Sequence, residues 1–252
     1  MAKNRAYPIL LVDAGNSAVK FAVKSQGNLR PRILATLPTA SLTAAQVKAL
    51  CKKIRPERTA AACVVPGVAR ILRTACPGIL LIGPRTPLEF KTLVDRRTIG
   101  ADRLANMAEA FRCHRRGLIV ASFGTAATFD VLDQGGCHTG GAIAPGWGTL
   151  SDALESRAAL LPSAQDVRPR RWTGRNTNEA LRAGMAGGYA ALVSRMLEKL
   201  CAENFGQRRP KIIFTGGDAR IVKRLTGLSA NVDTLWTLRG IAALADQMET
   251  EG

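Results

Sequence analysis

Short apolar runs alternate with longer amphipathic segments along the whole chain. Residues 8–12 have the length of a buried strand, and residues 18–24 alternate apolar and basic side chains, as a strand with one buried face does. Residues 101–115 carry apolar side chains at helical spacing. This alternation predicts an α/β protein. The other predicted elements are a helix after Thr43, strands at 59–65 and 78–82, a strand pair within 118–131, a glycine-rich link at 140–146, helices at 149–161, 178–203 and 238–248, and a strand, a turn and the start of a helix from 211 onward.

The opening pattern recurs near the middle of the chain. Residues 118–131 repeat a strand, a glycine turn and a second strand, and Gly124 falls where Gly15 stands in the first copy. A supersecondary unit repeated at about half the chain length indicates two related domains that face each other. We therefore expect one domain at 1–116 and another at 117–252.

Three glycine turns follow three apolar strands, at residues 13–17, 122–126 and 215–218. A glycine lets backbone N–H groups approach an anion without a Cβ in the way. A single turn of this kind is most often only a turn, but three in one chain favour a bound nucleotide, with two turns at its phosphates and the third near its base or ribose. The sequence has neither a P-loop nor a Rossmann fingerprint, which excludes those two nucleotide sites.

Composition and charge narrow the classes further. Hydrophobic residues make up 46% of the chain, which is enough for a buried core and argues against disorder. The net charge of +17 favours acidic partners, yet the basic residues are spread along the chain and only 5% of residues are aromatic, which favours solvated surfaces over a nucleic-acid site.

No apolar run reaches membrane-spanning length and no signal-peptide core is evident, so we expect a cytoplasmic protein. The six cysteines contain no C-x-x-C pair and no zinc spacing, which favours buried, reduced thiols.

Six motifs, in order along nearly the whole chain, resemble those of type III pantothenate kinases. Residues 13–20 resemble the D-x-G-N-[ST]-x-x-K phosphate loop, residues 100–103 the G-x-D-R signature, and residues 124–130 the second phosphate loop. The three remaining motifs are Gly140–Gly146 with the segments that follow it, Asn176–Gly184, and Thr215–Gly217.

The resemblance implies two ribonuclease-H-like domains of the actin, hexokinase and heat-shock ATPase superfamily, with a nucleotide cleft between them. It implies the ATP-dependent phosphorylation of pantothenate to 4′-phosphopantothenate, the first step of coenzyme A synthesis. It further implies a homodimer that uses Mg²⁺ and a monovalent cation, K⁺ or NH₄⁺. The expected partners are pantothenate and ATP, with no membrane and no specific nucleic acid.

The resemblance also assigns roles to residues. Phosphoryl transfer depends mostly on positioning and charge stabilisation. Asp102 is expected to accept the proton of the substrate hydroxyl, and Asp13 to hold Mg²⁺ through water. Arg103 is expected to neutralise negative charge near the substrate, and Thr177 to hydrogen-bond to pantothenate. The expected ATP-phosphate set is Asp13, Ala14, Gly15, Asn16, Ser17, Lys20, Gly124, Thr125, Gly216 and Gly217, and the expected substrate set is Gly100, Ala101, Asp102, Arg103 and Thr177.

Each of these residues also has a purely structural explanation. Asp13 at a turn is typical of an Asx-turn, and Asp102 near a helix start is typical of capping or of a favourable helix dipole. Thr125 suits a strand edge, and Thr177 suits a helix N-cap. Only the combined order of the motifs favours the functional roles.

Two positions depart from the family pattern. The second loop of the family usually reads D-x-G-T-A, and its Asp helps to bind the monovalent cation, whereas this chain has Ser122, a neutral and weaker ligand. Upstream of the G-x-D-R signature the family carries a Tyr and a Pro on the pantothenate side, where this chain has Leu93 and Arg96. These departures bear on the potassium requirement and on substrate affinity.

The departures and the net charge motivate two alternatives. The first is a catalytically weak homologue that acts as a transcriptional accessory or regulatory protein. The second is another kinase or ATPase of the same superfamily with a different small substrate. An assay with ATP, Mg²⁺ and pantothenate separates them, because turnover supports the kinase and nucleotide binding without turnover supports the regulator.

Overall fold

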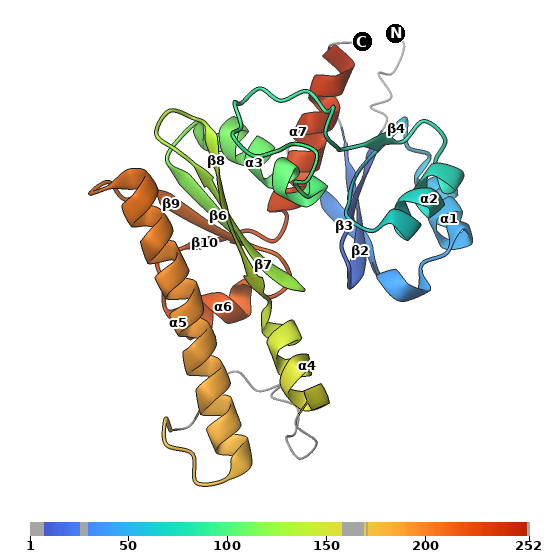
Figure 1. Cartoon of the computed structure of the whole chain (residues 1–252). Helices are drawn as coiled ribbons and strands as arrows, with labels where there is room; N and C mark the ends of the chain where they lie inside the picture. Colours follow the sequence, from blue (N-terminus) through green and yellow to red (C-terminus); the bar gives the residue numbers. More distant parts are fainter. Residues whose placement is uncertain (1–7, 26–29, 158–168, 170, 251–252) are drawn as a thin grey trace. The chain divides into compact units, whose positions relative to one another are not determined.

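The computed structural model describes residues 8–25, 30–157, 169 and 171–250. The chain divides into two compact units, Met1–Arg115 with Leu235–Gly252, and Arg116–Thr234. Each unit contains one five-stranded sheet with helices packed on it (Figure 1). The first unit holds β1 (Ile9–Ala14), β2 (Ala18–Lys24), β3 (Arg32–Pro38), the 3-10 helix η1 (Thr39–Ser41), α1 (Ala44–Ile54), β4 (Arg58–Cys63), α2 (Pro66–Ala75), β5 (Leu80–Leu81), α3 (Ala101–His114) and α7 (Trp236–Thr250). The second holds β6 (Leu118–Phe123), β7 (Ala126–Leu132), β8 (His138–Pro145), α4 (Trp147–Arg157), α5 (Thr177–Phe205), β9 (Lys211–Thr215), α6 (Ala219–Thr226) and β10 (Asn231–Val232).

The two sheets share one topology, which confirms the internal repeat. The first sheet has the order β3-β2-β1-β4-β5, and the second, read in the matching direction, has the order β8-β7-β6-β9-β10. In each sheet the first strand is antiparallel to its hairpin partner and parallel to the strand on its other side. The carboxyl ends of β1 and β4, and likewise of β6 and β9, therefore meet at one edge of their sheet.

The first sheet is covered on both faces. Leu10, Val12 and Ala14 of β1 point into a core shared with α1 and α2. Because successive side chains alternate across a strand, Asp13 points to the opposite face. That face is the one on which α3 and α7 pack, against β1 and β4. The sheet thus presents the Asp13 carboxylate toward the side that carries α3.

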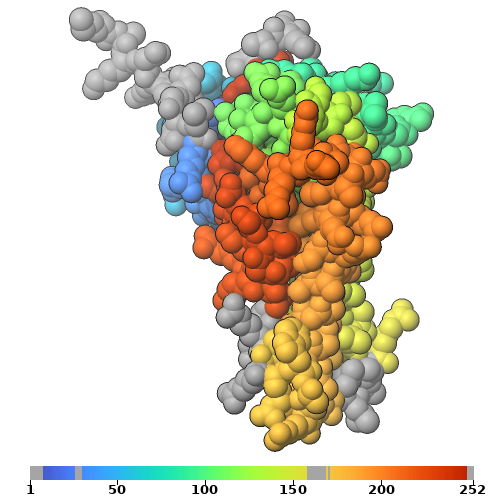
Figure 2. Space-filling view, turned by 90° about the vertical axis from the view of Figure 1, so that its left-hand side faces the viewer, coloured from blue at the N-terminus to red at the C-terminus, as the bar shows by residue number. Residues whose placement is uncertain are grey.

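The second sheet packs α5 and α6 on one face. The rings of Phe123, Phe129 and Phe214 meet edge-on in this core, and Tyr189 of α5 meets Trp147 in the same way. Figure 2 shows α5 running lengthwise over the surface of this unit. None of the helices in the described ranges is both long and apolar enough to cross a membrane.

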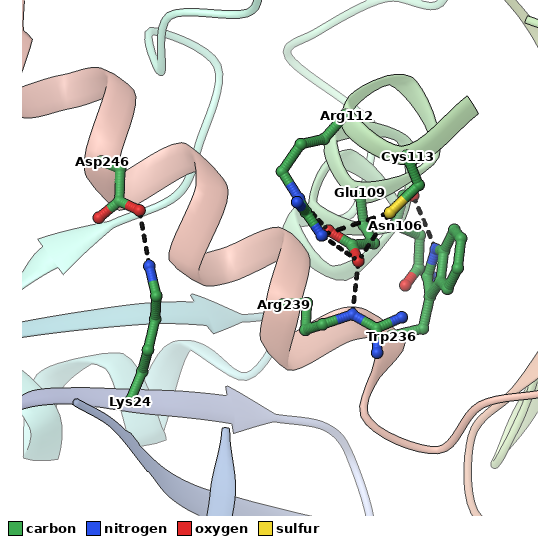
Figure 3. Close-up of polar contacts among 8 residues, drawn as sticks. All are labelled: Lys24, Asn106, Glu109, Arg112, Cys113, Trp236, Arg239 and Asp246. Atoms are coloured by element: carbon green, nitrogen blue, oxygen red, sulfur yellow. Dashed lines mark hydrogen bonds and ion pairs between the residues drawn. The ribbon is translucent and has the colours of Figure 1, made fainter. Parts of the chain in front are cut away.

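The predicted domain boundary between residues 116 and 117 is wrong for the last helix. Residues 238–248 were expected to belong to the second domain, but α7 lies in the first unit and packs along α3 (Figure 3). A Cβ on Gly240 would lie 1.8 Å from the carbonyl oxygen of Ala105, so only glycine permits this approach of the two backbones. Trp236 and Thr237 donate hydrogen bonds to the carbonyl and side-chain oxygens of Asn106, at 3.0 and 2.9 Å.

A buried carboxylate anchors the same contact. Glu109 of α3 is fully buried and accepts hydrogen bonds from Arg112, at 2.7 and 2.9 Å, and from Arg239 of α7 (Figure 3). Farther along α7, Asp246 pairs with Lys24 at 2.7 Å. A buried charge is stable only when it is paired and hydrogen-bonded, and the two arginines meet that need.

Several local predictions were also wrong. The strand expected at 59–65 is β4, which ends at Cys63, and Pro66 begins α2, because a proline in the first helical turn sacrifices no hydrogen bond. The glycine-rich link at 140–146 is mostly strand β8. Strand β3 was not predicted at all. The helix expected at 149–161 begins at Trp147 and is described to Arg157, so its expected end lies outside the described residues.

We predict that Glu109→Gln lowers the free energy of unfolding by about 3 kcal/mol, because it leaves two guanidinium groups without their buried counter-charge. The matched control is Glu198→Gln, which breaks an exposed Arg–Glu pair of the same i,i+3 spacing and should cost no more than about 0.5 kcal/mol. Urea unfolding followed by circular dichroism measures both. Equal shifts in the two variants would refute the anchoring role of Glu109.

Candidate active site

The first glycine turn is fixed by a short helix that follows the neighbouring strand. The backbone N–H of Gly15 donates to Ala18 at 3.0 Å, which closes the turn between β1 and β2. Thr39 of η1 holds the turn from outside, because its hydroxyl donates to the carbonyl of Gly15 at 2.7 Å and its N–H donates to the carbonyl of Ser17 at 3.1 Å. Asn16 and Ser17 are exposed at the tip of the turn. Sequence reasoning missed Thr39, which no family motif contains.

Two carboxylates of the first unit influence each other. Asp13 is the next-to-last residue of β1, and Asp102 lies in the first turn of α3. Burial raises the pKa of Asp13 to about 6, Lys20 acts against this rise, and the negative charge of Asp102 adds to it. Two acids that are 89 residues apart in the sequence therefore lie within electrostatic reach of each other, and Asp13 remains mostly ionised at neutral pH.

The start of α3 is built around Gly100. A Cβ on Gly100 would lie 2.5 Å from Oδ1 of Asp102, so the glycine leaves room for this carboxylate. The same Cβ would lie 3.6 Å from Val64, the residue after β4. Val64 in turn donates its N–H to the carbonyl of Ala14, at 3.1 Å. A short chain of contacts thus links the first turn of α3 to the end of β1.

Lys20 supplies a cation at this edge of the sheet. It stands directly opposite Asp13 in the register of β2 and β1, so both side chains lie on the same face. Its positive charge lowers the pKa of Asp13. Arg103, beside Asp102, is half-buried at the start of α3.

The other two glycine turns lie side by side in the second unit. Gly216 has φ +91°, and a Cβ there would lie 2.2 Å from the carbonyl oxygen of Phe123, at the end of β6. Asp218 donates its N–H to the same carbonyl, at 3.1 Å. The turn after β9 is therefore pressed against the turn that carries Gly124 and Thr125, and Gly217 and Thr125 are exposed.

The start of α4 supports the second turn from its other side. Gly146 donates its N–H to the carbonyl of Thr125 at 3.0 Å, and the Thr149 hydroxyl donates to the same oxygen at 2.6 Å. A Cβ on Gly146 would lie 1.9 Å from the carbonyl oxygen of Gly124. The glycine-rich motif that follows β7 thus serves to bring a helix start against this turn.

Ser122 lies in a row of hydroxyl side chains. It pairs with Thr128 on β7 and with Thr215 on β9, and all three share one face of the sheet. The hydroxyls of Thr128 and Thr215 are buried, and within the described part of the chain neither has a hydrogen-bond partner. The carboxylate of Asp130, one step along β7 on the same face, is bonded to His138 at 3.0 Å.

Thr177 lines a hollow of about 540 Å³ at the start of α5. It is the first residue of the helix, while the N-cap is Asn176, whose side chain accepts from the N–H of Glu179 at 3.0 Å. The alternative role of Thr177 as N-cap is therefore wrong, and its exposed hydroxyl is not used for capping. The side chain of Glu179 accepts from the N–H of Arg175, which completes the start of the helix.

Comparison with known proteins gives the same family as these motifs. The family model for type III pantothenate kinase matches residues 9–199, more than half of the 252 residues. Type III pantothenate kinases of Methylacidiphilum infernorum and Akkermansia muciniphila are 32% and 34% identical to the chain, each over 94% of its length and over 88% and 97% of their own. The chain belongs to the type III pantothenate kinase family.

Solved structures agree on the fold. A Baf family transcriptional activator from Campylobacter jejuni superposes with a TM-score of 0.64 at 21% identity, covering 96% of this chain and 99% of that one. MreB 5 of Spiroplasma citri superposes with a TM-score of 0.50 at 11% identity, covering 98% of both. At these identities the likeness concerns the fold alone. It confirms the predicted α/β class and the two-domain fold of the actin-like ATPases.

The oxygen atoms that this chain offers suit Mg²⁺ better than they suit a monovalent cation. Among the described residues no three His, Cys, Asp or Glu side chains gather into a metal cluster. Mg²⁺ does not need one, since it is commonly held by one or two carboxylates with water and substrate phosphates, and Asp13 offers such an oxygen. The hydroxyl row at Ser122 offers neutral oxygens only, which is a poor match for a cation held by a carboxylate.

The structure shows the surroundings of Leu93 and Arg96, the two residues that depart from the family pattern on the pantothenate side. Leu93 is 64% exposed, so it forms no wall of a buried pocket within the chain. Arg96 is half-buried and donates a hydrogen bond to the carbonyl of Thr86, which ties the segment before α3 to the loop after β5.

We predict that Gly216→Ala destabilises the second unit by about 2 kcal/mol, because alanine is strained at this positive φ and its Cβ collides with the Phe123 carbonyl. The control is Gly217→Ala, one residue on, where an added Cβ meets nothing within 4 Å. It should change stability by less than about 0.5 kcal/mol. Denaturant midpoints measure both, and similar values would show that the turn is free to move away from β6.

Proposed function

We propose that this chain transfers the terminal phosphoryl group of ATP to pantothenate, giving 4′-phosphopantothenate in the first step of coenzyme A synthesis. The observation that carries the proposal is the pair of acids at the end of β1 and the start of α3, where Asp13 and Asp102 interact electrostatically. Family membership gives the reaction, and these two carboxylates match its two acidic roles.

Asp102 acts as the general base in this proposal. Its carboxylate lies in the first turn of α3, beside Gly100. It accepts the proton of the primary hydroxyl of pantothenate as that oxygen attacks the phosphorus. Arg103 offsets the negative charge of the substrate carboxylate or of the transferring group.

The glycine turns hold the phosphate chain. Exposed N–H and hydroxyl groups of Asn16 and Ser17 in the first unit, and of Thr125 in the second, serve as donors to phosphate oxygens. Lys20 adds a positive charge beside Asp13. The turn at Gly216 and Gly217 contacts the adenosine part of the nucleotide.

The residues present support a role for Mg²⁺ more strongly than a role for a monovalent cation. Asp13 holds Mg²⁺, which neutralises charge on the phosphates when bound. The hydroxyl row at Ser122, Thr128 and Thr215 takes the place of the carboxylate that holds a monovalent cation in the family pattern. We therefore propose that dependence on K⁺ or NH₄⁺ is weakened, with a basic side chain supplying the charge.

We further propose a cytoplasmic homodimer in which Thr177 hydrogen-bonds to pantothenate and no nucleic acid is bound specifically. The exposed hydroxyl of Thr177 beside a hollow at the start of α5 supports this role. The regulatory alternative is not favoured, because relatives above 30% identity are named as kinases, whereas the likeness to a transcriptional activator concerns the fold alone.

We predict that Asp102→Asn lowers turnover about 10²-fold or more, because asparagine keeps the shape of the side chain but does not accept the proton. Nucleotide binding should be largely retained. The matched control is Asp95→Asn on the preceding loop, where the exposed carboxylate pairs with Arg97, and its turnover should stay within about twofold. Steady-state assays with ATP, Mg²⁺ and pantothenate provide the measurement, and near-normal turnover of Asp102→Asn would exclude it as the base.

We predict that wild-type activity depends weakly on potassium and that Ser122→Asp gains saturable activation by potassium. The new carboxylate would stand between the two buried threonine hydroxyls and supply the anionic oxygen that the row lacks. A potassium titration of both proteins, with sodium replacing potassium at constant ionic strength, gives the comparison. Strong activation of the wild type at low potassium would mean that the hydroxyls and backbone carbonyls suffice.

A further inference from the structure

Two thiols that are distant in the sequence lie in contact in the first unit. Cys51 is in the last turn of α1, and Cys76 caps the end of α2. Their Sγ atoms are 3.1 Å apart. A disulfide bond is about 2.05 Å long, so bond formation requires the sulfurs to approach by only about 1 Å.

The scaffold holds the two sulfurs in place. Helices α1 and α2 pack against each other on the same face of the first sheet (Figure 1). Val47 of α1 and Leu72 of α2 are fully buried in the core beneath them. Two groups held at contact distance by a rigid scaffold react with a high effective concentration, which favours ring closure over reaction with a second molecule.

A pocket of about 450 Å³ gives access to the pair. Both cysteines line it, together with Arg55, which caps the end of α1, and Arg58, the first residue of β4. Cys51 is half-buried, whereas Cys76 is only 6% exposed. A small molecule that enters the pocket therefore reaches the sulfur of Cys51 more readily.

We propose that Cys51 and Cys76 form a redox-active dithiol, which a small disulfide such as glutathione disulfide converts reversibly into an intramolecular disulfide that joins α1 to α2.

The exchange balances in two steps. The thiolate of Cys51 attacks one sulfur of glutathione disulfide, so that a mixed disulfide forms on Cys51 and one glutathione thiolate leaves and takes up a proton. The sulfur of Cys76 then attacks Cys51, the protein disulfide forms, and the second glutathione leaves as a thiol. The protein loses two hydrogen atoms in total, and the electron pair reduces one glutathione disulfide to two thiols.

The order of attack follows from the surroundings of the thiols. Burial raises the pKa of Cys76 to about 12, and the hydrogen bond and charge of Cys51 add to the rise. Cys76 is thus kept as a thiol, and the less buried Cys51 is the sulfur that a disulfide in the pocket reaches first. Cys76, whose sulfur is already 3.1 Å away, then resolves the mixed disulfide on Cys51.

Other cysteine thiols are engaged differently. Cys63 donates to the carbonyl of Val65 at 3.3 Å, and Cys113 donates to the carboxylate of Glu109 at 3.2 Å. Cys201 lies on α5 in the second unit, half-buried, where burial raises the pKa of its thiol, and it serves as a reference thiol outside the pair.

The test treats the native full-length chain with glutathione disulfide, traps free thiols with an alkylating reagent at low pH, and maps tryptic peptides by mass spectrometry. We expect the peptide 49–52 linked to the peptide 74–85, formed at least about tenfold faster than any product at Cys201. Dithiothreitol should reverse the link. Stable glutathione on Cys51 of the wild type without this link, or equal labelling of all cysteines, would overturn the proposal.

Variants separate the two thiols. Cys76→Ala should leave glutathione trapped on Cys51, and Cys51→Ala should leave Cys76 mostly as a free thiol. Cys201→Ala, the matched control, should form the 49–52 to 74–85 link at the wild-type rate. Since the decisive measurement uses the wild-type protein, a variant that fails to fold does not weaken the test. A Cys51→Ala protein that is modified at Cys76 as fast as the wild type would contradict the assigned order.

Discussion

The buried carboxylate of Glu109 is the constraint on which the first unit depends. A charge in the core is tolerated only with partners, and here the partners come from α3 itself and from α7, near the other end of the chain. This requirement holds α7 along α3, and the close approach at Gly240 leaves little freedom for sliding. The helix that carries Asp102 is thereby fixed against the sheet that carries Asp13.

A second general feature is that turns and polar groups lie at the ends of strands. In both units an antiparallel hairpin lies next to a parallel strand, so that turns and polar groups gather where the parallel strands end. In the first unit this arrangement brings Asp13 close to the start of α3, and in the second it presses the turn at Gly216 against Phe123. A repeated topology thus places a glycine turn at the corresponding strand end of each unit.

Much of this was predictable from local patterns, and the exceptions have physical causes. The hairpins, the repeat and the family follow from short motifs. Strand β3 was missed because it is largely exposed and alternates weakly. The strand at 140–146 looked like a link because of its glycines, yet a Cβ on Gly141 would lie 1.6 Å from the carbonyl oxygen of Phe129, so glycine is what allows that strand to pair closely. The Thr39 brace, the contact of Cys51 with Cys76 and the place of α7 depend on tertiary packing, which no local pattern encodes.

The discontinuous first unit has a consequence for biosynthesis. The nascent chain exposes α3, with Glu109, before the whole second unit is made, and Arg239 emerges only afterwards. Until α7 leaves the ribosome, Glu109 has only Arg112 of its two arginine partners. The first sheet meanwhile lacks helix α7, which packs on one of its faces. The inserted unit is continuous in sequence and can complete its own core earlier, so the N-terminal half of this protein is the part that finishes folding last.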